Sequence, residues 1–157
     1  MTSDRELRAE ITIDAPPSAV WAVITDTKAL AEISPELMAM TPLRRGGFRV
    51  GQQYVGWNRR KGVIWPTRNV VTAVQPEKLL AWDTKSSGAR WIYELTAEGG
   101  GTRVVERRPV PHRLTLLSRL FAPLALGGSE SHADELEAGM TEGLARIKAR
   151  AEAGGGA

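Results

Sequence analysis

Residues 7–13 alternate between apolar and polar side chains. Leu7, Ala9, Ile11 and Ile13 are apolar, and the residues between them are polar. A period of two is typical of a β-strand with one buried face. We therefore predict a first strand over this segment.

Two short helices are predicted after this strand. Pro17 suits the first turn of a helix, and apolar residues at helical spacing follow it. Asp26 or Thr27 can cap a second helix. That helix should end at Ser34-Pro35, because a residue before proline avoids the helical conformation.

The chain between residues 37 and 109 changes to runs of Val, Trp, Tyr and Thr that alternate with turn-forming Gly, Ser and Gln-Pro segments. This pattern predicts a meander of β-hairpins. Pro66 cannot donate a hydrogen bond to a sheet, so Trp65-Pro66 should mark a strand start, an edge or a bulge. The predicted strands lie near 37–44, 51–58, 67–75, 78–84, 89–97 and 102–108.

The last part of the chain is predicted to be helical. Residues 114–126 have helical apolar spacing and favour a short, lid-like helix, whereas Ser131 starts a long helix with one apolar stripe. We predict a single α+β domain over 1–152, with a seven-stranded curved antiparallel sheet wrapped around this helix, and a disordered Gly-rich tail over 153–157. The stripe consists of Ala133, Leu136, Met140, Leu144, Ile147 and Ala151.

Composition narrows the classes of function. The 157 residues are 42% hydrophobic and 25% charged, as expected of a globular protein. The absence of cysteine excludes disulfides and thiolate chemistry, and two histidines leave little for zinc, so no metal and no cofactor are expected. The net charge of +3 is offset along the chain by 18 acidic residues, so nucleic acid is not an expected partner.

The chain shows no targeting or membrane-spanning signal. Residues 1–6 are polar and mixed in charge, unlike a secretory signal. The apolar stretch 114–126 is interrupted by charge and proline and is shorter than the roughly 20 residues that cross a bilayer. A cytoplasmic location is expected.

Tryptophans are the first candidates for a binding site. Four of the five lie on the meander or its margins, and a single helix is too narrow to fill the hollow of a wide curved sheet. Aromatic side chains there either fill the gap or line a pocket. We predict that Trp65 and Trp91 line a pocket, whereas Trp21 is structural.

Strand parity gives a second candidate, Glu106. Trp91, Tyr93 and Leu95 should share the inner face of their strand. In the last strand either parity buries one acid or two arginines. Glu106 is the leading polar candidate for the pocket, and an ordinary surface salt bridge is the alternative. A buried carboxyl would need a partner or stay protonated, and Arg68, Arg90 or Asn69 could supply the hydrogen bond.

Two glycines on the long helix also require an explanation. Gly139 and Gly143 lie one turn apart, and each costs about 1 kcal/mol relative to alanine in a helix interior. They either leave space for a ligand beside Met140 and Leu144, or allow close packing against a strand, or occupy positions that simply tolerate glycine.

The order of the elements and several local segments resemble the helix-grip superfamily (START-like, SRPBCC). The segments are Ile13-Asp14-Ala15-Pro16 leading into Val20-Trp21, Trp91 to Leu95, and Gly101 to Glu106. They look most like bacterial polyketide cyclase/dehydrase-like members. The resemblance implies a cavity for lipids, sterols or polyketides between sheet and helix, and it carries over no universal catalytic residue.

Three functions follow as hypotheses. The preferred one is a carrier for a hydrophobic or aromatic small molecule, of lipid or polyketide type. The second is a cyclase or dehydratase-type enzyme in which Glu106 is the catalytic candidate, assisted by Tyr93 or His112. The third is an interaction module that forms a homodimer through residues 114–121. The expected ligand-binding residues are Trp65, Asn69, Trp82, Trp91, Tyr93, Glu106, Met140, Gly143 and Leu144.

Overall fold

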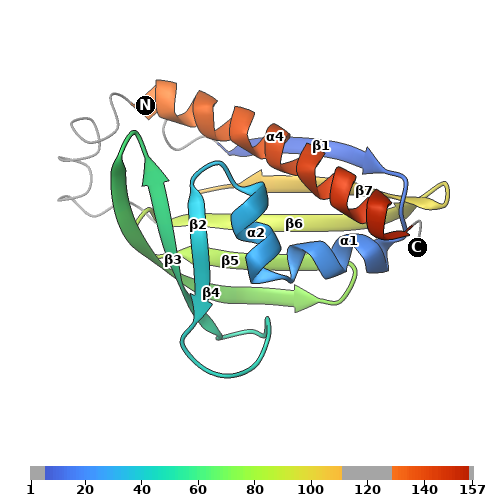
Figure 1. Cartoon of the computed structure of the whole chain (residues 1–157), viewed down its shortest axis with the longest axis horizontal. Coiled ribbons are helices and arrows are strands. Elements are labelled where there is room, and N and C mark those ends of the chain that lie inside the picture. Colours follow the sequence, from blue (N-terminus) through green and yellow to red (C-terminus); the bar gives the residue numbers. More distant parts are fainter. Residues whose placement is uncertain (1–5, 111–128, 156–157) are drawn as a thin grey trace.

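A seven-stranded antiparallel sheet in the order β1-β7-β6-β5-β4-β3-β2 curves around a long helix in the computed structural model, which describes residues 6–110 and 129–155 (Figure 1). Two short helices follow the first strand. The predicted α+β fold class and the order of its elements are confirmed. The strands are β1 (Leu7–Ile13), β2 (Leu37–Pro42), β3 (Gln53–Arg60), β4 (Val63–Gln75), β5 (Leu79–Thr84), β6 (Ala89–Glu98) and β7 (Gly101–Arg108), and the helices are α1 (Pro17–Ile24), α2 (Thr27–Ile33) and α4 (Ser129–Gly155).

The short helices begin and end where the sequence indicates. Pro17 occupies the first turn of α1. Asp26, one of the two expected caps of α2, accepts hydrogen bonds from the backbone N–H groups of Lys28 and Ala29 at 3.0 and 3.3 Å. The helix ends at Ser34, directly before Pro35.

The first and last strands pair with each other and place β1 at the edge beside β7. The Thr102 hydroxyl donates a buried hydrogen bond to the Ala15 carbonyl at 2.8 Å. Any side chain at Gly101 would bring a Cβ to within 2.4 Å of the Ile13 carbonyl oxygen, so this position requires glycine. The start of β7 is thus also the point where the chain closes on its first strand.

The β4 strand begins at Val63, four residues before its predicted start, and includes Pro66. Its pairing with β5 starts only at Asn69, so the proline lies where β4 has β3 as its one hydrogen-bonded neighbour. The edge interpretation of Pro66 is therefore correct, and the missing N–H costs the sheet no bond.

Helix α4 is longer than predicted at both ends. It begins at Ser129 rather than Ser131 and runs through Gly155. Residues 153–155 are therefore helical rather than part of a disordered tail, which corrects the prediction. Buried Ala151 and the hydrogen bond from the Asp14 N–H to Glu152, at 2.9 Å, fix the last turns against the end of β1. The predicted lid helix and dimer face lie in 111–128, outside the described residues.

The position of α4 determines which part of the sheet it covers. Among the described residues, the backbone of α4 lies close to β1, β7, α1 and α2 but not to β3, β4 or β5, although the Glu135 side chain reaches Arg60 at the end of β3. Figure 1 shows the helix lying along β1 and crossing toward the short helices. The concave face of the central strands is therefore left for side chains or a cavity. None of the helices in the described ranges has the length and apolar character required to cross a membrane.

Candidate functional site

A cavity of about 290 Å³ lies between the concave face of the sheet, the α2–β2 corner and α4. Side chains on β3 to β7 form one wall, because alternate residues of each strand point to the same face. Leu136, Gly139, Met140 and Gly143 of α4 form part of the opposite wall. The central strands that α4 does not cover therefore face this helix across the cavity.

Eight of the nine predicted ligand-binding residues line this cavity. The exception is Leu144, which is 1% exposed and packs in the hydrophobic core instead. The helical stripe is wide enough that one side of it reaches the cavity while the other contacts the core. Those that line the cavity are Trp65, Asn69, Trp82, Trp91, Tyr93, Glu106, Met140 and Gly143.

The tryptophans divide between the two faces of the sheet. Trp65, Trp82 and Trp91 line the cavity, and the Trp82 ring lies 5.8 Å from that of Tyr93. Trp57 is 44% exposed and belongs to the opposite parity. Trp21 packs against the core, in agreement with its expected structural role. Three aromatic rings on one wall give the cavity a largely apolar surface.

The glycines of α4 allow this helix to approach the α2–β2 corner. A Cβ at Gly139 would lie 3.0 Å from Cγ of Pro35, whereas one at Gly143 would be in ordinary contact, 3.5 Å from the Ile33 carbonyl. Both glycines also line the cavity. Close packing therefore explains Gly139. At Gly143 there is room for a side chain.

Glu106 is the buried carboxyl of the cavity. It lies directly opposite Tyr93 in the β6–β7 ladder and is 4% exposed. Burial raises the pKa of Glu106 to about 8, although a hydrogen bond with the Tyr93 hydroxyl acts in the other direction. Burial also raises the pKa of Tyr93, and the neighbouring Glu106 adds to the effect. The pair is therefore neutral near pH 7.

The three residues predicted as partners of Glu106 make their polar contacts elsewhere, so that prediction was wrong. Arg90 forms a two-pronged ion pair with Asp83 at 2.6 and 3.1 Å, and Arg68 binds Gln53 at 2.9 Å. Both arginines have the parity of the outer face. The partner is Tyr93, which the expected inward parity of β6 already placed on the same face as the acid.

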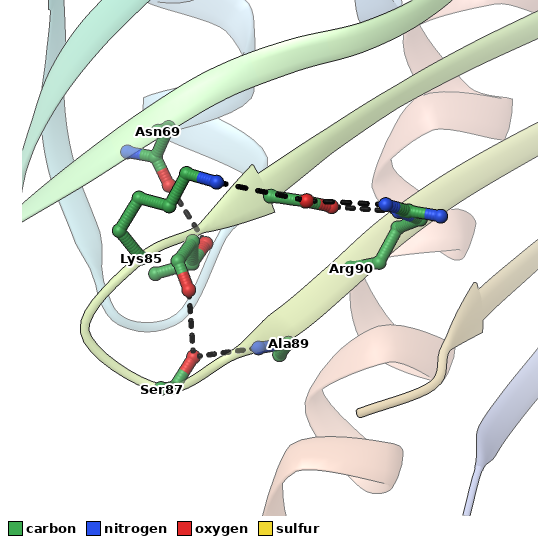
Figure 2. Close-up of polar contacts among 7 residues, drawn as sticks. Asn69, Lys85, Ser87, Ala89 and Arg90 are labelled. Carbon is green, nitrogen blue, oxygen red and sulfur yellow. Dashed lines mark hydrogen bonds and ion pairs between the residues drawn. The ribbon is translucent and has the colours of Figure 1, made fainter. Parts of the chain in front are cut away.

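A neutral hydrogen-bonded network lies on the wall formed by β3, β4 and β5. The Thr84 hydroxyl donates to Asn69 at 2.7 Å, and the amide groups of Asn69 and Asn58 donate to the Thr67 hydroxyl at 3.3 and 3.1 Å. Figure 2 shows Asn69 beside the turn that Ser87 stabilises through Ala89. The network gives this wall polarity without charge.

Arg108 lines the cavity and was not identified from the sequence. It follows Glu106 by two residues, so the alternation that turned the acid inward also turns the arginine inward. Its Cζ lies 5.4 Å from the centroid of the Trp91 ring. Burial lowers the pKa of Arg108, and Glu36 opposes this effect. The parity of β7 was the signal that could have identified it.

The wall offers groups for hydrogen bonding and proton transfer. Within 6–110 and 129–155, no three His, Asp or Glu residues are grouped so as to hold a metal ion. Glu106 and Tyr93 supply neutral acidic hydroxyls, Arg108 supplies a cation, and the Asn69 network supplies amides. A bound molecule could therefore be both oriented and polarised.

A family model described as "Polyketide cyclase / dehydrase and lipid transport" matches residues 4–152. No curated protein matches by sequence. Among solved structures, the di-domain ARO/CYC StfQ from the steffimycin biosynthetic pathway superposes with a TM-score of 0.75 at 14% identity, over 97% of this chain. The chain spans about half of that protein, 52% of its length.

Two other solved structures share the fold over most of their own length. The polyketide_cyc-like protein Cgl2372 from Corynebacterium glutamicum is 24% identical, with a TM-score of 0.61 over 91% of this chain and 88% of that one. Ara h 8.0201 is 12% identical, with a TM-score of 0.66 over 95% and 98% of the two chains. At these identities the similarity shows a shared helix-grip fold.

Proposed function

Because this chain belongs to the polyketide cyclase / dehydrase and lipid transport family, we propose that it is a carrier that binds a hydrophobic, aromatic small molecule in the cavity under α4. The observation that carries this proposal is the wall of three tryptophans on the uncovered strands. Trp65, Trp82 and Trp91 face the same space as Met140, whose flexible side chain adapts to varied apolar shapes.

The size of the cavity limits the ligand. An engineered apolar cavity of about 150 Å³ accommodates one benzene molecule, and drug-sized ligands occupy pockets of about 300 Å³ or more. At about 290 Å³, the cavity suits a molecule of two or three fused rings. A more open pocket at the β3–β4 hairpin tip shares Glu36, Leu37 and Gly139 with the cavity wall, and we propose that ligands enter there.

We expect the neutral three-ring probe 1-aminoanthracene to quench the tryptophan fluorescence of the full chain at one saturable site. The quenching arises because the bound rings lie against indoles that line the cavity, and energy transfer falls steeply with distance. Trp65→Phe and Trp91→Phe should each reduce the quenched fraction. A fluorescence titration of the three proteins measures this.

Trp57→Phe is the matched control, because Trp57 lies on the opposite face of the sheet. Its removal should leave the affinity for the probe unchanged. Quenching that does not saturate, or that disappears with Trp57 and survives in the other two variants, would contradict the carrier proposal.

The buried acid favours enzyme activity as a second candidate function. A carboxylic acid that stays neutral at pH 7 can donate a hydrogen bond to a ligand carbonyl and so stabilise the enol that cyclisation or dehydration requires. Glu106 and Tyr93 meet this condition within the cavity wall. The carrier and the enzyme would then share one binding site.

Proton exchange at the α-carbon of 2-tetralone tests this second function. If Glu106 polarises the carbonyl, the protein should accelerate deuterium uptake from heavy water, and Glu106→Gln should lower that rate by about a hundredfold. Quenching of tryptophan emission by 2-tetralone should persist in the variant. An equal exchange rate in both proteins, measured by NMR, would leave the carrier as the function.

A further inference from the structure

Arg108 is a cation in the cavity wall without a hydrogen-bonded partner at its Nε. This atom is buried, and nothing within the described residues accepts its hydrogen. The guanidinium lies over the Trp91 ring, with Cζ 5.4 Å from the centroid. The ring stabilises the charge from one side but accepts no in-plane hydrogen bond. Arg108 also lines the cavity, so its side chain is within reach of a molecule bound there.

The neighbouring carboxyl groups do not neutralise Arg108 by direct pairing. Glu36, the nearest opposing charge, forms an ion pair with Arg60 at 3.7 Å, and Arg60 also pairs with Glu135. Glu106 points inward from the same strand but is neutral near pH 7, because its pKa is about 8. In the described part of the chain, no carboxylate oxygen lies within ion-pair distance of Arg108.

The rest of the wall contains no competing cation. Among the described residues that line the cavity, Arg108 is the single Lys, Arg or His side chain. The neutral network around Asn69 lies on the same sheet wall, and its hydroxyls and amides bond to one another. An anionic group entering the cavity would therefore find one favourable position, at the guanidinium beside Trp91.

We propose that the ligand of the cavity is an aromatic carboxylic acid, which binds as its carboxylate to Arg108 while its rings lie against Trp82 and Trp91. A guanidinium matches a carboxylate with two parallel N–H···O bonds. A half-buried arginine that lacks an ion-pair partner among the described residues therefore favours an anionic ligand over a neutral one. This inference rests on the proposed carrier function and names its ligand class.

Two probes of the same shape test the proposal: 2-naphthoate and 2-naphthamide, titrated calorimetrically into the full chain at pH 7. We expect naphthoate to bind the wild type more tightly by about tenfold or more, the size of one charge-assisted pair. Arg108→Gln should abolish this preference by weakening naphthoate binding and should leave naphthamide affinity unchanged. Arg108→Lys keeps the charge but loses the fork, so it should retain only part of the preference.

Arg107→Gln is the matched control. Arg107 is the preceding residue on β7, faces outward and pairs with Glu6 and Glu94 at 2.9 and 2.6 Å. Its loss should not change the ratio of the two affinities. Circular dichroism shows whether each variant is folded, and Arg108→Lys provides the test if Arg108→Gln does not fold.

The possible outcomes distinguish a failure of this inference from a failure of the carrier function. Equal binding of both probes to the wild type, or a preference that survives in Arg108→Gln, would overturn the role of Arg108 while the carrier function stands. If neither probe binds but 1-aminoanthracene does, the carboxylic acid class is wrong. If no aromatic probe binds, the carrier function itself fails.

Discussion

Between pH 5 and pH 8 the wild-type protein should lose about 3 kcal/mol of unfolding free energy that the Glu106→Gln variant keeps. The pKa of Glu106 is about 8 in the folded chain, against an ordinary value of 4.5. A group whose folded pKa is the higher one contributes its full stability below the unfolded pKa. That contribution is lost as the pH rises from 4.5 toward 8. Glutamine stays neutral throughout, so the variant escapes this loss.

Urea unfolding of both proteins at pH 5, 6, 7 and 8 measures the effect. Tyr93→Phe provides a related variant, because the Tyr93 hydrogen bond lowers the pKa of Glu106 and its removal should extend the loss of stability to higher pH. Unfolding free energies of wild type and Glu106→Gln that run parallel between pH 5 and 8 would mean that the carboxyl is already ionised in the folded protein.

Binding of aromatic probes should fall by about tenfold or more when Thr67 is replaced by phenylalanine. Thr67 faces the cavity from β4, between Asn58 and Asn69, and accepts hydrogen bonds from both. A phenyl ring there occupies space that the ligand needs in a cavity of about 290 Å³. The affinity of 1-aminoanthracene, measured by tryptophan quenching, reports the change.

Arg68→Phe places the same ring on the neighbouring residue, which points to the outer face and contacts Gln53. This control should bind the probe as the wild type does, with a similar change in β-propensity. If both variants bind normally, the probe occupies some other site. If both lose binding equally, the effect comes from a distorted β4 rather than from a filled cavity.

Local patterns were sufficient to locate most elements. Asp26 caps α2 because its short side chain reaches the first free N–H groups, and this depends on only a few neighbouring residues. Pro66 marked an edge because a missing N–H has the same consequence in any sheet. Helix α4 begins two residues before its predicted start and extends into the glycine-rich segment, because helix ends depend on what packs against them.

Parity along the strands also predicted the cavity wall. The alternation of Trp91 and Tyr93 placed both on the inner face, and the structure has both in the wall. The same rule applied to β6 would have excluded Arg90 as a partner of Glu106, and applied to β7 it would have identified Arg108. These errors came from incomplete use of a signal that the sequence contains.

The sequence by itself determined the fold class and the order of the elements along the chain, because strands and helices follow from periods of two and 3.6 residues within one segment. Only the tertiary structure decided that Tyr93 lies opposite Glu106, that Trp91 packs under Arg108 and that Leu144 belongs to the core. Such pairings depend on the register between strands and on the angle at which α4 crosses them. Both are set by packing across the whole domain, which no short segment encodes.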